Sequence, residues 1–470
     1  MNSLAQTPSA PRLAPRDLLR SGLCVGCGSC AAQTGEHERR MDWGGDGQFK
    51  PAGSRLSMAR AEAQLARICP SSPWTANEDE LAATLFPGAL HVDTLVGRYQ
   101  GAFVGSVAEG QFREQGSSGG MVSWVATELL QRGLVDAVAH VTPVADPAAD
   151  KRFFRYRLSR TPAQLAAGAK SRYYPVELSQ VLREIRSTPG RYAVVGIPCF
   201  TKAVQLLRRD DPLMCERIRF TLGLFCGHMK SARLLESFAW QLGVDLADVA
   251  GVEYRLKNPD RPASWYTAEL RLRDGRRLQR DWFHLAEGDW GSGFFQNRAC
   301  NFCDDVVAET ADISFGDAWV EPYMQDGRGT NVVLVRSPVL QQLVASAIAE
   351  GRLALAPVDA DFVRRTQAAG LRHRREGLAY RLTWPHHGRL VPRKRVTPEA
   401  GSMPRPRKLL YRIRAHVSRW SPAIFRLARA LRCRWLYLAW ARGVVALYHG
   451  LAYSRGRLGE ALARFGWRAR

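Results

Sequence analysis

The chain has 470 residues, 46% hydrophobic and 24% charged, which is ordinary for a soluble globular protein and leaves room for two or three domains. Its 67 Lys and Arg against 44 Asp and Glu give a net charge of +23, but the segment from Pro404 to Arg470 holds 16 of the cations and one acid, so the excess is local. Ten cysteines without an apolar leader in the first 15 residues favour reduced cytosolic thiols for metal or redox chemistry over a disulfide-bonded secreted domain.

A cysteine-rich segment follows a start, residues 1–20, that is predicted to be disordered. Cys24, Cys27 and Cys30 have the spacing C-x2-C-x2-C, and Cys69 precedes a proline much later. This pattern is typical of bacterial ferredoxins, whose fourth ligand comes from a remote position, so it predicts a 4Fe–4S cluster. Zinc is the alternative, although zinc sites usually combine two C-x2-C pairs, or cysteines with histidines.

The next stretch alternates between expected strands and helices. After a linker with a short helix over residues 71–100 we expect a strand over Ala102–Val107, and the Gly-Ser-Ser-Gly-Gly turn at residues 116–120 leads into a helix over Met121–Arg132. Free N–H donors at such a helix start suit a phosphate, and a plain N-cap with a tight turn is an equal alternative. A strand over Val135–Val141 then closes a strand–helix–strand unit.

The segment Lys170–Tyr174 places two cations, a hydroxyl and two aromatic rings in five positions. It is suited to hold a pyrophosphate and stack on a flat ring, and a solvated helix start explains it equally well. Expected elements then continue the alternation, which predicts a doubly wound sheet: a helix over Val176–Arg186, a strand over Tyr192–Gly196, a helix over Thr201–Arg208 and a strand over Phe220–Phe225.

Two further cysteines follow the ends of those strands. Cys199 comes after the strand that ends at Gly196, and Cys226 directly follows the next one. Ligands of such sheets bind at the carboxyl ends of the strands, so we expect both thiols to meet the C-x2-C pair Cys300/Cys303 in a second 4Fe–4S site. The alternative is a lone thiol that fills the core, which we assign to Cys215 and Cys433.

The rest of the chain is less regular. Beyond residue 360 the periodicity fades, and residues 404–470 form a basic, aromatic and helical tail. The predicted segments are 1–20, the ferredoxin-like segment 21–98, the α/β domain 99–360, an extension over 361–403, and the tail. Other expected elements are a helix over Ser231–Leu242, a strand over Val252–Leu256, hairpin strands over Thr267–Arg273 and Arg277–Trp282, a strand over Asn331–Arg336 and a helix over Pro338–Glu350.

Taken in order, several short motifs resemble the coenzyme F-420 hydrogenase/dehydrogenase beta-subunit family. They are Gly-Gly before a helix, Lys-Ser-x-Tyr at Lys170–Tyr173, Gly-x-Pro-Cys at Gly196–Cys199, Leu-Phe-Cys-Gly-His at Leu224–His228, and the stretch from Cys300 to Trp319 that ends in Ile-Ser-Phe-Gly-Asp-Ala-Trp. The resemblance covers residues 20 to 340. It implies a doubly wound mixed α/β sheet and an FAD-binding iron–sulfur oxidoreductase.

Carried over residue by residue, the resemblance implies a flavin site and two clusters. The cluster ligands would be Cys24, Cys27, Cys30 and Cys69 in one and Cys199, Cys226, Cys300 and Cys303 in the other. The flavin site would contain Ser118, Gly119, Gly120, Lys170, Ser171, Tyr173, Gly196 and Pro198. A Gln that the family usually has after Gly-x-Pro-Cys is Phe200 here, which distinguishes this chain at that position.

The resemblance further implies electron transfer between a ferredoxin-like or deazaflavin carrier and an organic substrate, because a flavin converts between single electrons and pairs. The alternative is an electron-relay subunit without its own substrate site. No catalytic residue is assigned: His228 and Asp317 have suitable chemistry for proton delivery, but a structural histidine and a helix-capping aspartate are the more common explanations.

The tail has two interpretations. Trp435–Tyr453 is apolar except for Arg442 and His449, and a charge in the middle disfavours a membrane span and suits a helix in the headgroup layer. This predicts a cytoplasmic protein that touches the inner face of the membrane. A core-packed helical cap with a solvated basic end is the alternative. Nucleic-acid binding is not expected, since no recognition motif accompanies the charge.

Overall fold

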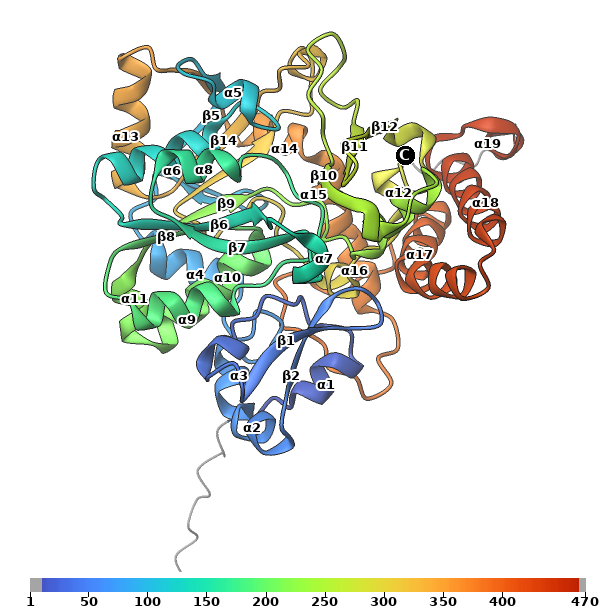
Figure 1. Cartoon of the computed structure of the whole chain (residues 1–470), viewed down its shortest axis with the longest axis horizontal. Helices are drawn as coiled ribbons and strands as arrows, with labels where there is room; N and C mark the ends of the chain where they lie inside the picture. Colours follow the sequence, from blue (N-terminus) through green and yellow to red (C-terminus); the bar gives the residue numbers. More distant parts are fainter. Residues whose placement is uncertain (1–10, 465–470) are drawn as a thin grey trace, which may run out of the picture.

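The computed structural model describes residues 11–464 and is organised around an eight-stranded mixed sheet (Figure 1). Parallel pairing joins β13 to β9, β9 to β8 and β8 to β6, while the outer strands pair antiparallel. The expected mixed α/β class is confirmed. In sheet order the strands are β15 (Leu353–Pro357), β5 (Gly101–Val107), β14 (Asn331–Val335), β13 (Ile313–Asp317), β9 (Ile218–Leu224), β8 (Tyr192–Gly196), β6 (Ala137–Pro143) and β7 (Phe154–Ser159).

Helices cover both faces of this sheet, as the layers above and below it in Figure 1 show. One face buries Trp124 and Leu129 together with Leu340 and Val344, and the other buries Leu182 and Phe200. The first face is covered by α6 (Met121–Gln131), α8 (Pro162–Ala167) and α13 (Pro338–Ala349), and the second by α9 (Ser179–Ser187), α10 (Pro198–Asp210) and α11 (Pro212–Arg217).

The amino-terminal segment is a small unit beneath the sheet. It contains α1 (Pro15–Arg20), η1 (Ala31–Gln33), the antiparallel strands β1 (Arg39–Trp43) and β2 (Phe49–Gly53), α2 (Arg55–Arg60) and α3 (Glu62–Ile68). Arg183 of α9 fastens the unit to the sheet domain by donating to the carbonyl oxygens of Ala31 at 2.7 Å and Arg39 at 2.6 Å. Disorder was the wrong prediction for residues 15–20, because Pro15 and Leu18 of α1 are buried; residues 1–10 lie outside the described part.

A second sheet is inserted between β9 and β13. The predicted hairpin is present: β11 (Thr267–Leu272) and β12 (Arg277–Asp281) are antiparallel, and β10 (Val249–Glu253) pairs with β11. Gly275 supplies the positive φ of 88° that the tight turn needs. Around it lie α12 (Arg233–Gln241), η2 (Leu246–Asp248), η3 (Trp282–His284), η4 (Trp290–Ser292) and η5 (Arg298–Phe302).

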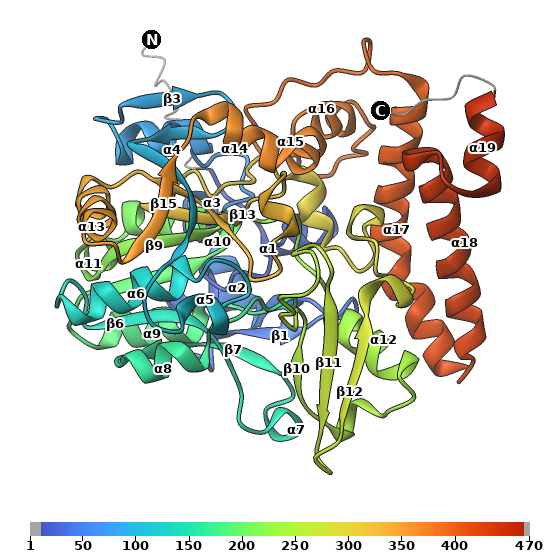
Figure 2. The ribbon, with the colours of Figure 1, turned by 90° about the horizontal axis from the view of Figure 1, so that it is seen from above.

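The tail folds into α17 (Arg405–Ala430), α18 (Arg434–Tyr453) and α19 (Gly456–Arg464), and the α17–α18 hairpin lies along one edge of the molecule (Figure 2). Phe425 and Tyr437 are fully buried against Phe295 and the inserted sheet. One face of the hairpin is therefore core-packed, as the second interpretation predicted. Among the described residues no helix is both long and apolar enough to cross a bilayer.

Several sequence expectations need correction. β5 and β6 do not form a strand–helix–strand unit, because four other strands lie between them in the sheet. The linker over residues 71–100 contains α4 (Glu78–Leu85), β3 (His91–Asp93) and β4 (Gly97–Tyr99), and the aperiodic stretch after residue 360 contains α14 (Ala360–Thr366), α15 (Ala368–Arg374) and α16 (Glu376–Leu382). Strands β7 and β15, and the short elements α5 (Phe112–Gln115), α7 (Pro147–Asp150) and η6 (Tyr323–Gln325), were not predicted.

Candidate functional site

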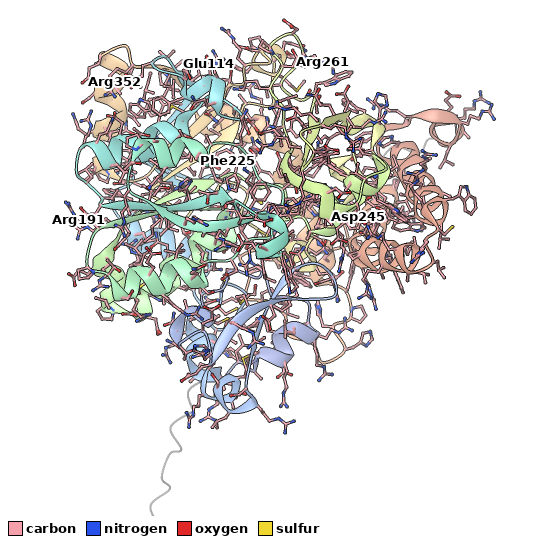
Figure 3. All side chains as sticks on the ribbon, in the orientation of Figure 1. Glu114, Arg191, Phe225, Asp245, Arg261 and Arg352 are labelled. Carbon is pink, nitrogen blue, oxygen red and sulfur yellow. The ribbon has the colours of Figure 1, made fainter. Side chains whose placement is uncertain are left out.

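A cavity of about 890 Å³ opens where β8 and β9 end. Figure 3 shows the direction of these strands: Arg191, just before β8, lies at the edge of the molecule, whereas Phe225, just after β9, lies near its centre and lines the cavity. This is the edge at which doubly wound sheets bind ligands. Of the predicted flavin residues, the wall contains Ser118, Gly120, Lys170, Ser171, Tyr173 and Gly196.

The Gly-rich turn forms one side of the cavity. Gly120 caps α6 with a φ of 87°, and a Cβ there would lie 2.6 Å from the carbonyl carbon of Phe112, so only glycine fits. The backbone N–H of Ser171 donates to Ser117 Oγ at 2.8 Å, which joins the Lys-Ser loop to the turn. Lys257 Nζ donates to the carbonyl oxygen of Ser118 at 3.0 Å and brings a further cation to this side.

Two predicted flavin residues, Gly119 and Pro198, do not line the cavity. A Cβ on Gly119 would come within 2.8 Å of Asn331 Oδ1, so this glycine lets the turn approach β14. Pro198 is buried at the start of α10, where its fixed φ suits the first helical turn. Phe200, at the position of the family's Gln, is buried, lines the cavity, and stacks on Tyr156 with ring centroids 6.2 Å apart.

Another part of the cavity wall is aromatic and is built around Trp290, a residue of the Gly288–Gly293 stretch that no motif singled out. Its ring stacks on His228 at 4.5 Å and contacts Tyr173 at 4.8 Å, and Lys230 Nζ lies 4.6 Å from its centroid. The signal in the sequence was weak, because Trp290 comes from the single-turn helix η4, about 60 residues beyond His228.

The two candidate acids both reach the cavity. His228 is buried with Nε2 unpartnered, and burial, together with Lys230 and two arginines, holds its pKa well below the ordinary value. The structural alternative for Asp317, a helix cap, is wrong. Asp317 ends β13 and pairs with Arg255 at 2.9 Å, and Arg255 in turn lies over the ring of Tyr266 at 4.4 Å.

The structure gathers the second set of predicted thiols beside this cavity. The Met229 backbone N–H donates to Cys300 Sγ at 3.3 Å, and Met229 Sδ lies 3.8 Å from Cys199 Sγ. Burial raises the pKa of Cys199, and Cys226, Cys303 and Cys300 raise it further because a thiolate on any of them would repel a thiolate at Cys199. Cys226 lines the cavity itself.

Arg374 of α15 holds the loops that carry these thiols, and no motif pointed to it. Its fully buried guanidinium donates to the carbonyl oxygens of Cys226 and Gly227 at 2.7 Å and of Asp305 at 2.9 Å. Burial opposes its charge, but the neighbouring Cys303, Cys226 and Cys300 keep its pKa above the ordinary value. The arginine therefore both clamps the loops and offsets negative charge on the sulfurs.

The amino-terminal thiols form the other predicted set. Burial raises the pKa of Cys69, and Cys27, Cys24 and Cys30 add to the shift. The glycines between these thiols are required by close contacts: a Cβ on Gly26 would lie 2.9 Å from the carbonyl oxygen of Phe49, and one on Gly28 would lie 2.6 Å from Glu177 Oε2.

The two thiol sets are neighbours. Cys27 of the first set contributes to the raised pKa of Cys199 in the second. The pKa of Tyr156, which lines the cavity, is raised mainly by burial and further by Cys199 and Cys27. The backbone N–H of Leu178 also donates to the carbonyl oxygen of Cys27 at 2.8 Å. Within residues 11–464, no three His, Cys, Asp or Glu side chains converge tightly enough to hold a single metal ion. Core filling is the wrong prediction for Cys215, which is exposed on the short helix α11, and Cys433 is only half-buried.

The α/β sheet, the cavity at its carboxyl edge and Cys226 in the wall of that cavity agree with the class that the family match shows, an electron-transfer oxidoreductase subunit. The beta subunit of coenzyme F420 hydrogenase/dehydrogenase has an N-terminal domain that matches residues 102–183 and a C-terminal domain that matches residues 190–361. Because the two cover more than half of the chain, it belongs to this family. The motif resemblance is thereby confirmed.

A solved structure of the F420-reducing [NiFe] hydrogenase complex from Methanosarcina barkeri contains a similar chain. The identity is 18% and the TM-score 0.46, over 60% of this chain and 92% of that one. No curated protein is significantly similar to the sequence.

Proposed function

We propose that the protein is a flavin- and 4Fe–4S-dependent oxidoreductase that passes electrons between a ferredoxin- or deazaflavin-type carrier and an organic substrate. The observation that carries this proposal is the position of Cys226 in the wall of a cavity of about 890 Å³, together with the Gly-rich turn and the Lys-Ser loop. A cavity of this size is at the upper end of the range for cofactor and ligand sites.

The residues around the cavity fit FAD. At the start of α6 the Met121 N–H donates to Asn331 Oδ1 at 3.2 Å, while the helix itself leaves the N–H groups of Val122 and Ser123 unpaired. Lys170 and Ser171 line the same cavity as these N–H groups, which suits a pyrophosphate. Tyr173 and Trp290 provide flat rings beside the cavity, and the unpartnered, buried Nε2 of His228 has room for a polar group of a ligand. A bound flavin would supply the conversion between single electrons and electron pairs.

The thiol sets fit iron–sulfur clusters by their chemistry. Each set offers four sulfur ligands and no histidine, as in 4Fe–4S sites, and backbone N–H groups such as that of Met229 point at a sulfur. The proximity of Cys27 to Cys199 and of Cys226 to the cavity supports a path from an external carrier, through the amino-terminal set and then the second set, to the cavity.

A relay subunit without its own substrate site is the second candidate, and anaerobic purification with reconstitution separates the two. We expect about one FAD per chain that becomes reduced when electrons enter through the clusters, with iron and sulfide for two clusters. A flavin-free chain that retains both clusters would favour the relay, and a colourless chain containing zinc would contradict both.

Matched cysteine variants sharpen this experiment. Cys226→Ser should lose the iron and sulfide of one cluster, half of the total, and also the electron transfer to the flavin. Cys215→Ser is the control, because Cys215 is an exposed thiol that belongs to neither set. If Cys226→Ser and Cys215→Ser retained the same iron, the assignment of the second cluster would be wrong.

A further inference from the structure

The end of α17, the start of α18 and the turn between them, residues 426–435, form an exposed apolar tip, which we call the tail tip. Leu427, Leu431 and Trp435 are 53%, 61% and 75% exposed, and Trp420, seven residues before Leu427 on the same face of α17, is 49% exposed. Single exposed apolar residues are ordinary, but four large ones within sixteen residues of a helical hairpin form a patch, which marks a contact surface.

Cations surround these side chains. Arg426, Arg429, Arg432 and Arg434 are all exposed in the tail tip, and no acidic residue occurs anywhere between Pro404 and Gly459. The partners of these arginines do not neutralise them. Arg426 and Arg434 donate to backbone carbonyl oxygens at 3.3 Å and 3.2 Å, and Arg429 lies over an indole ring at 5.7 Å.

The tip is presented on a rigid support. On the opposite face of the hairpin Phe425, Ala428, Tyr437 and Ala441 are buried in the core, and the Tyr437 hydroxyl donates to the buried carboxylate of Glu287. The helices that carry the tip are therefore well packed, and loose packing is not the reason why its apolar residues are exposed. The core face of the same helices already fixes their backbone, so docking costs little further conformational entropy.

We propose that the tail tip docks on an anionic lipid surface, with Leu427, Leu431 and Trp435 in the boundary between headgroups and acyl chains and the arginines on lipid phosphates. Apolar and indole side chains flanked by arginine are the composition that binds this layer. The positive charge of the tail tip favours an anionic lipid over a neutral one. The exposed apolar side chains favour a bilayer over an acidic protein as the partner.

Co-sedimentation of the full-length protein with vesicles tests the proposal. We expect binding to phosphatidylcholine vesicles that contain phosphatidylglycerol, weak binding to pure phosphatidylcholine, and a decrease with salt. Replacing Arg429, Arg432 and Arg434 together with Gln should lower the partition coefficient on the order of 100-fold, at about fivefold per charge. The double change Leu431→Ser and Trp435→Ser should lower it by roughly tenfold or more.

Matched controls keep the test specific. Replacing the exposed Arg209, Arg219 and Arg280 with Gln removes the same charge elsewhere, and Leu56→Ser with Leu90→Ser removes exposed leucines elsewhere. Circular dichroism and thermal unfolding verify that every variant folds. Equal losses in tip and control variants would overturn the proposal, as would a self-associated state that dissociates in the Trp435→Ser variant while vesicle binding is unchanged.

Discussion

Arg374→Met should destabilise the protein and disorder the second thiol set. Three carbonyl oxygens in the buried loops each receive a hydrogen bond from this guanidinium, at 2.7, 2.7 and 2.9 Å. Hydrogen bonds from a charged group contribute about 1.5–3 kcal/mol each, so three at the lower end give about 5 kcal/mol. That is a large share of a typical folding stability of about 5–15 kcal/mol. Arg374→Lys keeps the charge but cannot reach all three oxygens, so its loss should be intermediate.

The assay is urea unfolding under anaerobic conditions, combined with the iron content after reconstitution. Arg372→Met is the matched control, since Arg372 is exposed on the same helix, and it should change the unfolding free energy by no more than about 0.5 kcal/mol. We expect Arg374→Met to lose the iron of one cluster as well. If Arg374→Met and Arg372→Met unfolded at the same urea concentration, the clamp assigned to Arg374 would not exist.

Three other perturbations test the fold and the cavity. Burial lowers the pKa of His140 from 6.5 to about 4. The contribution of the neutral ring to folding stability is therefore complete above pH 6.5 and decreases by about 3 kcal/mol as the pH falls toward 4. His140→Gln should remove this part of the acid dependence, measured as the unfolding free energy at a series of pH values. Phe425→Ala should lower the unfolding free energy by about 3–5 kcal/mol, because it leaves a cavity at a buried position under the tail. The control Leu427→Ala, two residues further along and exposed, should change it very little. Equal melting temperatures of the two variants would contradict the packing of α17. Gly120→Ala adds both a backbone contact and a strained φ, so it should destabilise α6 by more than the roughly 1–2 kcal/mol that strain alone costs, and should weaken FAD binding. Gly133→Ala is its control in calorimetry, because Gly133 has a similar φ of 62° but open space around it.

Local features were predictable because their physical cause lies within a few residues. The strand over Tyr192–Gly196 was placed with the bounds that the structure has, and the hairpin at Gly275 was recognised from its turn residues. The helix after Gly120 was likewise expected, since small residues before an amphipathic stretch mark a helix start. Residues beyond 360 were misjudged, because the three short helices there take their stability from tertiary packing and show little periodicity of their own.

The composition and spacing of the sequence by themselves determined where the cysteines cluster along the chain, the alternation of strands and helices, and the basic tail. The tertiary structure alone decided that four strands separate β5 from β6 in the sheet, and that Trp290 and Arg374 join the site from short helices far along the chain. The reason is that strand order and side-chain convergence depend on contacts between segments distant in sequence. No local pattern encodes those contacts, whereas turn chemistry and helix periodicity are local.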